Sequence, residues 1–161
     1  MFQDELGLYA EKHLDEFEST FQLQFKDKSL LITALSHRSS LGPTLTSRAE
    51  MKRLALMGDK LIDLFLYRVL YRKGIQLKDM NKARRLTKNI ELNKVADELG
   101  FTKYLILENS ADEKIQRESV SFGSDSLEAL VGAIFIDAGF DESERYVENS
   151  ILPSLLKFSF D

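Results

Sequence analysis

The sequence predicts an all-α protein. Hydrophobic residues recur at intervals near 3.6 residues along almost the whole chain, whereas the alternation typical of strands is almost absent. The chain has 161 residues, 43% hydrophobic and 30% charged with only two prolines, a balance typical of a compact helical protein. We therefore expect residues 1–161 to form a single domain, long enough to bury its own core. Residues 1–13 would be an N-terminal helical extension of this domain.

Two helices are predicted near the N-terminus. The first is amphipathic, with Leu8, Leu14, Phe17 and Phe21 on its apolar side. After a short break, Asp27 is a suitable N-cap for a second helix over residues 28–36. The apolar positions of this second helix, which should face the core, are Leu30, Leu31 and Leu35.

A long central helix is predicted over residues 48–72. The preceding segment, 39–47, contains Gly42, Pro43 and several hydroxyl residues, which favours a loop. The helix ends before Gly74. Its apolar positions are Leu54, Leu61, Ile62, Phe65 and Val69.

Two shorter helices should follow, over residues 82–87 and 89–99. Asn89 is a candidate N-cap for the second of them, and Gly100 is a candidate stop. Leu92, Val95 and Leu99 would form the core side of this pair.

The C-terminal part is predicted to be a polar loop and two helices. The loop covers residues 108–121, and an apolar helix should follow over 125–138. The last helix is expected over 141–158, with a kink or a restart at Pro153 because proline removes a backbone donor.

Composition excludes several classes of site. The absence of cysteine rules out disulfides, a thiolate nucleophile and a cysteine-ligated zinc site. No apolar run approaches the roughly 20 residues of a membrane span, and the N-terminus carries Asp4 and Glu5 where a secretion signal would be basic. We expect a cytoplasmic protein with no membrane partner. The net charge of −4 argues against a bulk cationic coat, although a local basic stripe or a bound divalent metal would still admit a phosphate backbone.

Histidine chemistry is not favoured by the sequence. The two imidazoles are His13 and His37. His13 lies among charged residues, which favours a solvated side chain. His37 falls at a predicted helix end without a paired acid, so a capping or structural role is favoured over that of a general base.

Carboxylates are the better candidates for chemistry. Asp59 follows Gly58 inside an apolar helical stretch, and Asp125 and Glu128 are spaced i, i+3, which places them on one helix face. Carboxylates from two converging helices would suit a hard cation such as Mg²⁺ or Mn²⁺. The alternative from spacing alone is that Asp125 only begins its helix, favoured by the dipole, and that Glu128 is solvated.

Three motifs occur in order along residues 14–152. They are FQLQFKD running into LLITALSHRS (21–39), RLALMGDKLI (53–62) and SDSLEALVGAIFIDAG (124–139). Together they resemble the catalytic domain of the ribonuclease III family, whose signature helix reads Glu-Arg-Leu-Glu-Phe-Leu-Gly-Asp. The resemblance implies the family's all-α endonuclease fold, a dimer joined through the signature helix, and Mg²⁺-dependent cleavage of double-stranded RNA. We expect no appended double-stranded-RNA-binding domain in this sequence.

The resemblance also implies roles for particular carboxylates. Asp59, Asp125 and Glu128 match three family acids and would bind the metal, with Asp59 and Glu128 as the catalytic pair. Two family glutamates are replaced, by Lys52 and Ala55. Both positions lie on the helix face of Asp59, since seven residues span about 700° and four span about 400°. Glu50 cannot substitute, because nine residues fall about half a turn out of phase.

Two functions remain open from the sequence. The first is a metal-dependent endonuclease for double-stranded RNA with a reduced carboxylate set. The second is a catalytically inactive relative, an RNA-binding or structural subunit of a ribonucleoprotein complex. Either one would form a homodimer, or a heterodimer with another ribonuclease III-like chain. The sequence also contains a set of basic residues: Lys82, Arg84, Arg85, Lys88 and Lys94. These side chains could contact phosphates, or they could form a solvated helical face.

Overall fold

The computed structural model describes residues 2–36, 48–106 and 120–157. Within these ranges the chain is helical and contains no strand, which confirms the all-α prediction. An isolated parallel bridge joins Ser36 to Ile106, whose backbone N–H donates to the Leu35 carbonyl at 2.8 Å. None of the helices in the described ranges is long and apolar enough to cross a membrane.

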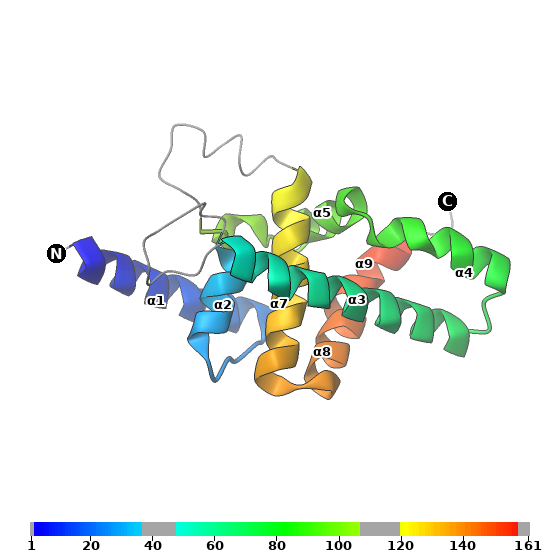
Figure 1. Cartoon of the computed structure of the whole chain (residues 1–161), viewed down its shortest axis with the longest axis horizontal. Coiled ribbons are helices and arrows are strands. Elements are labelled where there is room, and N and C mark those ends of the chain that lie inside the picture. Colours follow the sequence, from blue (N-terminus) through cyan, green and yellow to red (C-terminus); the bar gives the residue numbers. More distant parts are fainter. Residues whose placement is uncertain (1, 37–47, 107–119, 158–161) are drawn as a thin grey trace.

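The described residues form a series of helical elements. In chain order they are α1 (Phe2–Phe21), α2 (Lys28–Leu35), α3 (Arg48–Arg72), α4 (Leu77–Ala83), η1 (Arg84–Thr87), α5 (Asn89–Glu98), η2 (Thr102–Tyr104), α7 (Val120–Ala138), α8 (Phe140–Tyr146), η3 (Val147–Ile151) and α9 (Leu152–Lys157). Figure 1 shows α7 running through the middle of the molecule, with α3 crossing it at a steep angle and α2, α5 and α8 around it. The longest helix, α3, and the central helix α7 therefore meet near the centre of the fold.

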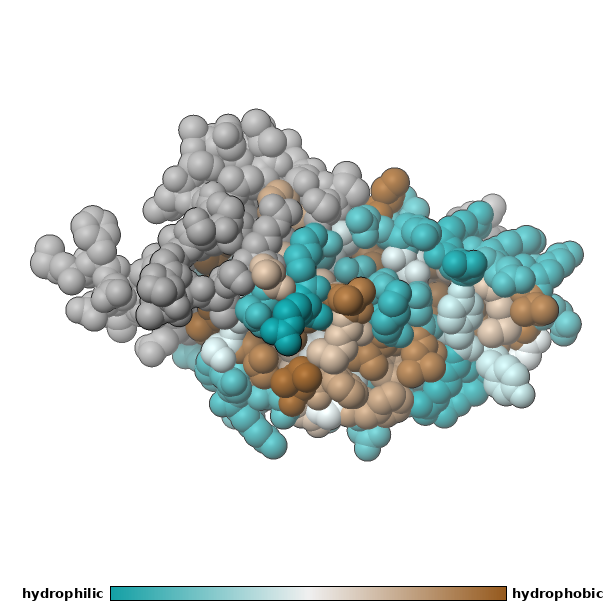
Figure 2. Space-filling model, viewed as in Figure 1, coloured by the Kyte–Doolittle hydropathy of each residue, from teal (hydrophilic) through white to brown (hydrophobic). Residues whose placement is uncertain are grey.

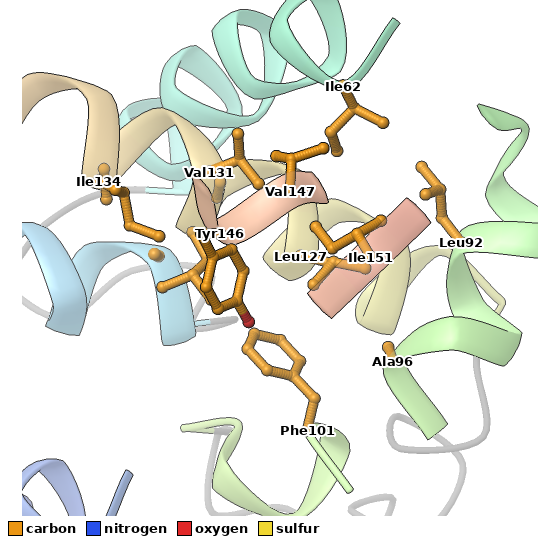
Figure 3. Packing of buried hydrophobic residues seen from close by; sticks show 14 of the residues in the cluster. Ile62, Leu92, Ala96, Phe101, Leu127, Val131, Ile134, Tyr146, Val147 and Ile151 are labelled. Atoms are coloured by element: carbon orange, nitrogen blue, oxygen red, sulfur yellow. The ribbon is translucent and has the colours of Figure 1, made fainter. Parts of the chain in front are cut away.

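The core surrounds α7. Leu127, Val131 and Ile134 of α7 face residues of the C-terminal helices and of α5 (Figure 3). The neighbours labelled with them in Figure 3 are Ile62, Leu92, Ala96, Phe101, Tyr146, Val147 and Ile151. All of these side chains are almost fully buried, and burial of this kind is the main favourable contribution to folding.

Helix α2 is held at its N-terminus by two aspartates. The Asp27 side chain accepts a hydrogen bond from the Ser29 backbone N–H at 2.9 Å, which confirms the predicted N-cap. Asp137, near the end of α7, accepts bonds from the backbone N–H groups of Lys26 and Asp27, each at 2.9 Å. The Ser126 hydroxyl of α7 also donates to the Ala34 carbonyl of α2 at 2.8 Å. Helix α2 is therefore tied to α7 at several points.

Helix α3 has the predicted bounds, but its successor does not. The predicted helix over 82–87 is wrong: α4 begins at Leu77, and η1 replaces α-helical geometry from Arg84 to Thr87. Leu77 is 73% exposed, and Ala83 is the buried residue of α4, so the apolar spacing did not mark where this helix begins.

Helix α5 begins one residue away from its predicted cap. Lys88 takes the cap position without a side-chain cap bond, and Asn89 is the first helical residue. The predicted Asn89 cap is therefore wrong. The stop at Gly100 is confirmed, since its φ of 69° is favoured for glycine.

Helix α7 begins at Val120, five residues before the predicted start at 125. Asp125 therefore lies inside the helix, and the alternative that it merely begins the helix is wrong. Of the predicted loop over 108–121, Val120 and Ser121 are helical, while 108–119 lie outside the described residues, as does the loop predicted over 39–47.

The last helical run begins at Phe140 rather than 141, and residue 158 lies outside the described residues. The predicted disturbance at Pro153 takes the form of the π-helical segment η3, in which the Leu152 N–H donates to the Val147 carbonyl. This wider turn accommodates a residue that has no backbone N–H.

Candidate active site

The backbones of α3 and α7 touch where the two helices cross. A Cβ added to Gly58 would lie 1.7 Å from the Glu128 carbonyl oxygen, and one added to Gly132 would lie 2.2 Å from the Leu54 carbonyl oxygen. Distances this short leave no room for a side chain at either glycine. The crossing therefore brings Asp59, which follows Gly58, next to the α7 segment that carries Glu128.

Two acidic side chains of α7 are buried at this crossing. Asp125 and Glu128 are each 8% exposed, which excludes the alternative that Glu128 is solvated. Burial, together with the nearby charges of Asp59 and Asp125, raises the pKa of Glu128 to about 8. Asp63 of α3 acts in the same direction, and the Lys52 ammonium opposes them. The negative charges of α3 and α7 are thus concentrated around the Glu128 carboxyl.

Lysine side chains contact two of these carboxylates. The Lys52 ammonium donates to Oδ2 of Asp125, and the Lys60 ammonium donates to Oδ2 of Asp59 at 2.8 Å. The Asp125 side chain is 12% exposed, whereas that of Asp59 is 28% exposed and its partner Lys60 is 70% exposed. The Lys52 pair is therefore the more enclosed of the two.

Ala55 brings a methyl group to the face of α3 where the resemblance implies a carboxylate. It is 4% exposed, one turn before Asp59. A buried methyl packs well there, and it leaves this face with one metal ligand fewer than the family signature has.

The acidic residues fit a divalent cation by their chemistry. Carboxylate oxygens are the ligands that Mg²⁺ and Mn²⁺ prefer, and the mutual repulsion of Asp59, Asp125 and Glu128 is what a bound cation would neutralise. In the arrangement observed, however, no three acidic or histidine side chains of the described residues form a ready ligand set. Lys52 supplies positive charge at Asp125 instead.

The two histidines and the basic residues considered from the sequence lie away from this cluster or outside the described residues. His13 is half-buried rather than solvated, and its ring lies edge-on to Tyr104 with 5.7 Å between the ring centroids. His37 lies outside the described residues. In the basic set, Lys82 pairs with Asp79 at 3.0 Å and Lys94 pairs with Glu91 at 3.3 Å.

A family model described as Ribonuclease-III-like matches residues 27–155, which include every carboxylate of the crossing. The chain belongs to this family. It is 33% identical over 145 residues to ribonuclease 3 of Nitratidesulfovibrio vulgaris, a match that covers 88% of this chain and 57% of the relative. It is 32% identical over 133 residues to ribonuclease 3 of Campylobacter jejuni, covering 81% of this chain and 57% of that protein. The ribonuclease III-like chain thus spans little more than half the length of these relatives.

Solved structures agree with the family assignment. The nuclease domain of ribonuclease III from Campylobacter jejuni superimposes with a TM-score of 0.73 at 28% identity, over 91% of this chain and 96% of that one. A second structure of that domain gives a TM-score of 0.71 at 29% identity, over 89% and 95%, and was described for flexibility in a region involved in dimer formation. The ribonuclease III endonuclease-domain fold predicted from the three motifs is confirmed.

Two residues that shape the cluster were absent from the sequence prediction. Asp63 lies four residues after Asp59 and adds to the negative charge felt by Glu128, so its i+4 spacing was the available signal. Gly132 lies four residues after Glu128 in a strongly apolar helix, where an isolated glycine indicates close packing.

Proposed function

We propose that this ribonuclease III-like domain hydrolyses phosphodiester bonds of double-stranded RNA at the crossing of α3 and α7. The observation that carries this proposal is the backbone contact between Gly58 and Glu128, which holds a carboxylate of α3 beside two of α7. A catalytic set held on crossed, packed helices is preorganised, because its side chains need little movement to reach working geometry.

Asp59, Asp125 and Glu128 are the residues that would hold Mg²⁺ or Mn²⁺. When bound, such a cation activates a water molecule and stabilises developing negative charge on phosphate. Asp59 and Glu128 are the proposed catalytic residues. Glu128 must lose its proton before it can ligate a cation, and its pKa of about 8 means that this step is favoured as pH rises toward and above that value.

We also propose that two ribonuclease III-like chains associate through α3. Among the apolar residues of this helix, Leu54, Leu61 and Phe65 are buried within their own domain, whereas Leu56 is 66% and Leu64 is 50% exposed. Figure 2 shows hydrophobic residues gathered on the face where α3 lies in front. A second chain, identical or related, would cover these side chains.

The second candidate is a subunit that binds RNA or supports a complex without cutting. The Lys52–Asp125 ion pair and the buried methyl of Ala55 favour it, because together they remove negative charge and ligands from the cluster. Fold alone does not separate the two candidates.

A cleavage assay distinguishes them. Purified protein is incubated with a long RNA duplex in about 5–10 mM Mg²⁺ or Mn²⁺, the range in which weak carboxylate sites fill. We expect endonucleolytic products from the duplex and none from single-stranded RNA of the same sequence. Asp59→Asn and Glu128→Gln should lower the rate by about 100-fold or more, whereas Asp97→Asn, at an exposed position of α5, should cut normally. Duplex binding without products in either metal would favour the non-catalytic subunit.

A further inference from the structure

Lys52 lies at the carboxylate cluster with its charged end directed inward. Its side chain is 46% exposed, yet its ammonium contacts Asp125, whose side chain is 12% exposed. A lysine can reach in this way because its long apolar stem follows the protein surface while its charged end bonds elsewhere. The contact spans 73 positions in sequence and joins α3 to α7.

In the metal-free protein, the positive charge of Lys52 offsets the negative charge of the buried carboxylates. Asp125 and Glu128 are both nearly buried, and Asp59 and Asp63 approach from α3. Buried carboxylates without a counter-charge are strongly unfavourable, so a cation near them stabilises the fold. Lys52 lowers the repulsion at Glu128, and the exposed Lys60 of α3 also interacts with that carboxyl.

A divalent cation and the lysine would compete for the same oxygen. Oδ2 of Asp125 accepts the Lys52 hydrogen bond, and a metal bound to that oxygen would meet the ammonium at close range. Two cations at one carboxylate oxygen repel each other, so the lysine opposes metal binding while it stays at Asp125.

We propose that Lys52 is a built-in cation of this site, which holds Asp125 in the metal-free protein and keeps divalent metal out until the lysine is displaced. The inference rests on the proposed function, because it names the regulation of the same carboxylates. It explains how the buried Asp125 carboxylate is stabilised when no metal is bound. Flexible lysine stems allow displacement, since the ammonium is a compact, strongly hydrated charge that is readily released to water.

The Lys60–Asp59 ion pair is not expected to control metal binding in the same way. Both of its side chains are more exposed than Asp125, and neighbouring residues on one helix turn form it at the surface. Exposed pairs of this kind contribute little and exchange easily with solvent. Lys52 is therefore the lysine whose removal should change metal binding.

The test measures metal binding by the whole chain. Binding of Mg²⁺ or Mn²⁺ is detected by thermal unfolding, recorded by circular dichroism, and by calorimetric titration. Lys52→Met keeps the apolar stem and removes the charge, and Lys52→Ala is the second variant. Lys82→Ala is the matched control, because Lys82 forms an exposed pair with Asp79 on α4.

In chelator, both Lys52 variants should melt below the parent protein, because the buried acids lose their counter-charge. Both variants should bind Mn²⁺ about ten-fold more tightly or better, and their melting temperature should rise with metal concentration by several degrees. The parent and Lys82→Ala should shift by about 1 °C or less at the same concentrations.

Metal affinity that is equal in the parent and in both Lys52 variants would overturn the inference, as would tight binding of metal by the parent.

A cleavage assay distinguishes failure of this inference from failure of the proposed function. If Lys52→Met binds metal tightly but no protein cuts duplex RNA, the proposed function fails and the inference holds. If the parent cuts and its metal affinity does not depend on Lys52, only the inference fails.

Discussion

The carbonyl oxygen of Glu128 lies 1.7 Å from the point that a Cβ on Gly58 would occupy. The main chains of α3 and α7 therefore pack directly against each other at this point. Asp59 and Glu128 therefore owe their proximity to backbone packing rather than to a bond between their side chains. Such a crossing is rigid, because close-packed backbones have few alternative arrangements.

Gly58→Ala should destabilise the fold strongly. The new methyl group would overlap backbone atoms that no side-chain rotation can move, so we expect a loss of about 3 kcal/mol or more. Gly74→Ala is the matched control, since Gly74 has φ of 70° and nothing within 4 Å of an added Cβ. Its cost should be the strain of a left-handed alanine alone, about 1 kcal/mol. Chemical denaturation measures both, and equal losses would show that α3 and α7 are not in backbone contact.

The stability of the metal-free protein should fall as pH rises. Glu128 has its pKa raised from 4.5 to about 8, so the folded state holds this proton more tightly than the unfolded chain. The associated stability is complete below about pH 4.5 and is lost as pH rises through about 8. Asp59, Asp63 and Asp125 act on it as negative charges, and Lys52 and Lys60 act on it as positive charges.

Glu128→Gln should remove this dependence. Between about pH 5 and 9 the variant should gain on the order of 4 kcal/mol relative to the parent, measured by urea unfolding in chelator. Glu98→Gln, at an exposed position of α5, should keep the parent's pH dependence. A constant difference between parent and Glu128→Gln across this range would contradict the buried, repelled carboxyl.

Association through α3 should depend on its exposed leucines. At micromolar concentration the parent should sediment as a dimer, and Leu56→Lys with Leu64→Lys should sediment as a monomer with unchanged helicity, because charge at an apolar interface is costly to desolvate. Ile90→Lys is the control, since Ile90 is 59% exposed on α5. A monomeric parent, or a dimer that survives the double substitution, would exclude this surface.

Local chemistry made much of the fold predictable. Helix α3 has the predicted bounds because its apolar spacing is long and its end coincides with Gly74, at φ of 70°. Asp27 was identifiable as a cap because its short acidic side chain can reach the Ser29 N–H. These features depend on neighbours in sequence, which a single chain displays directly.

Tertiary packing accounts for the errors. The start of α4 was missed because Leu77 is exposed. The start of α7 was missed because two serines and Gly123 alternate with Val120 and Phe122 before Asp125, which gives no clear helical pattern. At the site, spacing indicated that Asp125 and Glu128 share a helix face, but it contained no information on the Gly58–Glu128 contact. The partner of Lys52 lies 73 residues away, so its identity depends on the folded structure.

Restoring the family acids tests the central claim that Asp59, Asp125 and Glu128 form a nuclease site with reduced charge. Lys52→Glu with Ala55→Glu should lower stability in chelator, because two acids are added beside buried carboxylates. It should also tighten metal binding, since it supplies two further oxygen ligands. Glu128→Gln in the same background is the control that removes a proposed catalytic residue.

The decisive measurement is the single-turnover rate of duplex RNA cleavage in Mg²⁺ by the parent, by the Lys52→Glu/Ala55→Glu protein and by that protein with Glu128→Gln. The proposal predicts that the double substitution increases the rate by about ten-fold or more and that Glu128→Gln abolishes it. Metal affinity and cleavage that stay at the parent's level after the double substitution, or cleavage that persists without the Glu128 carboxyl, would contradict it.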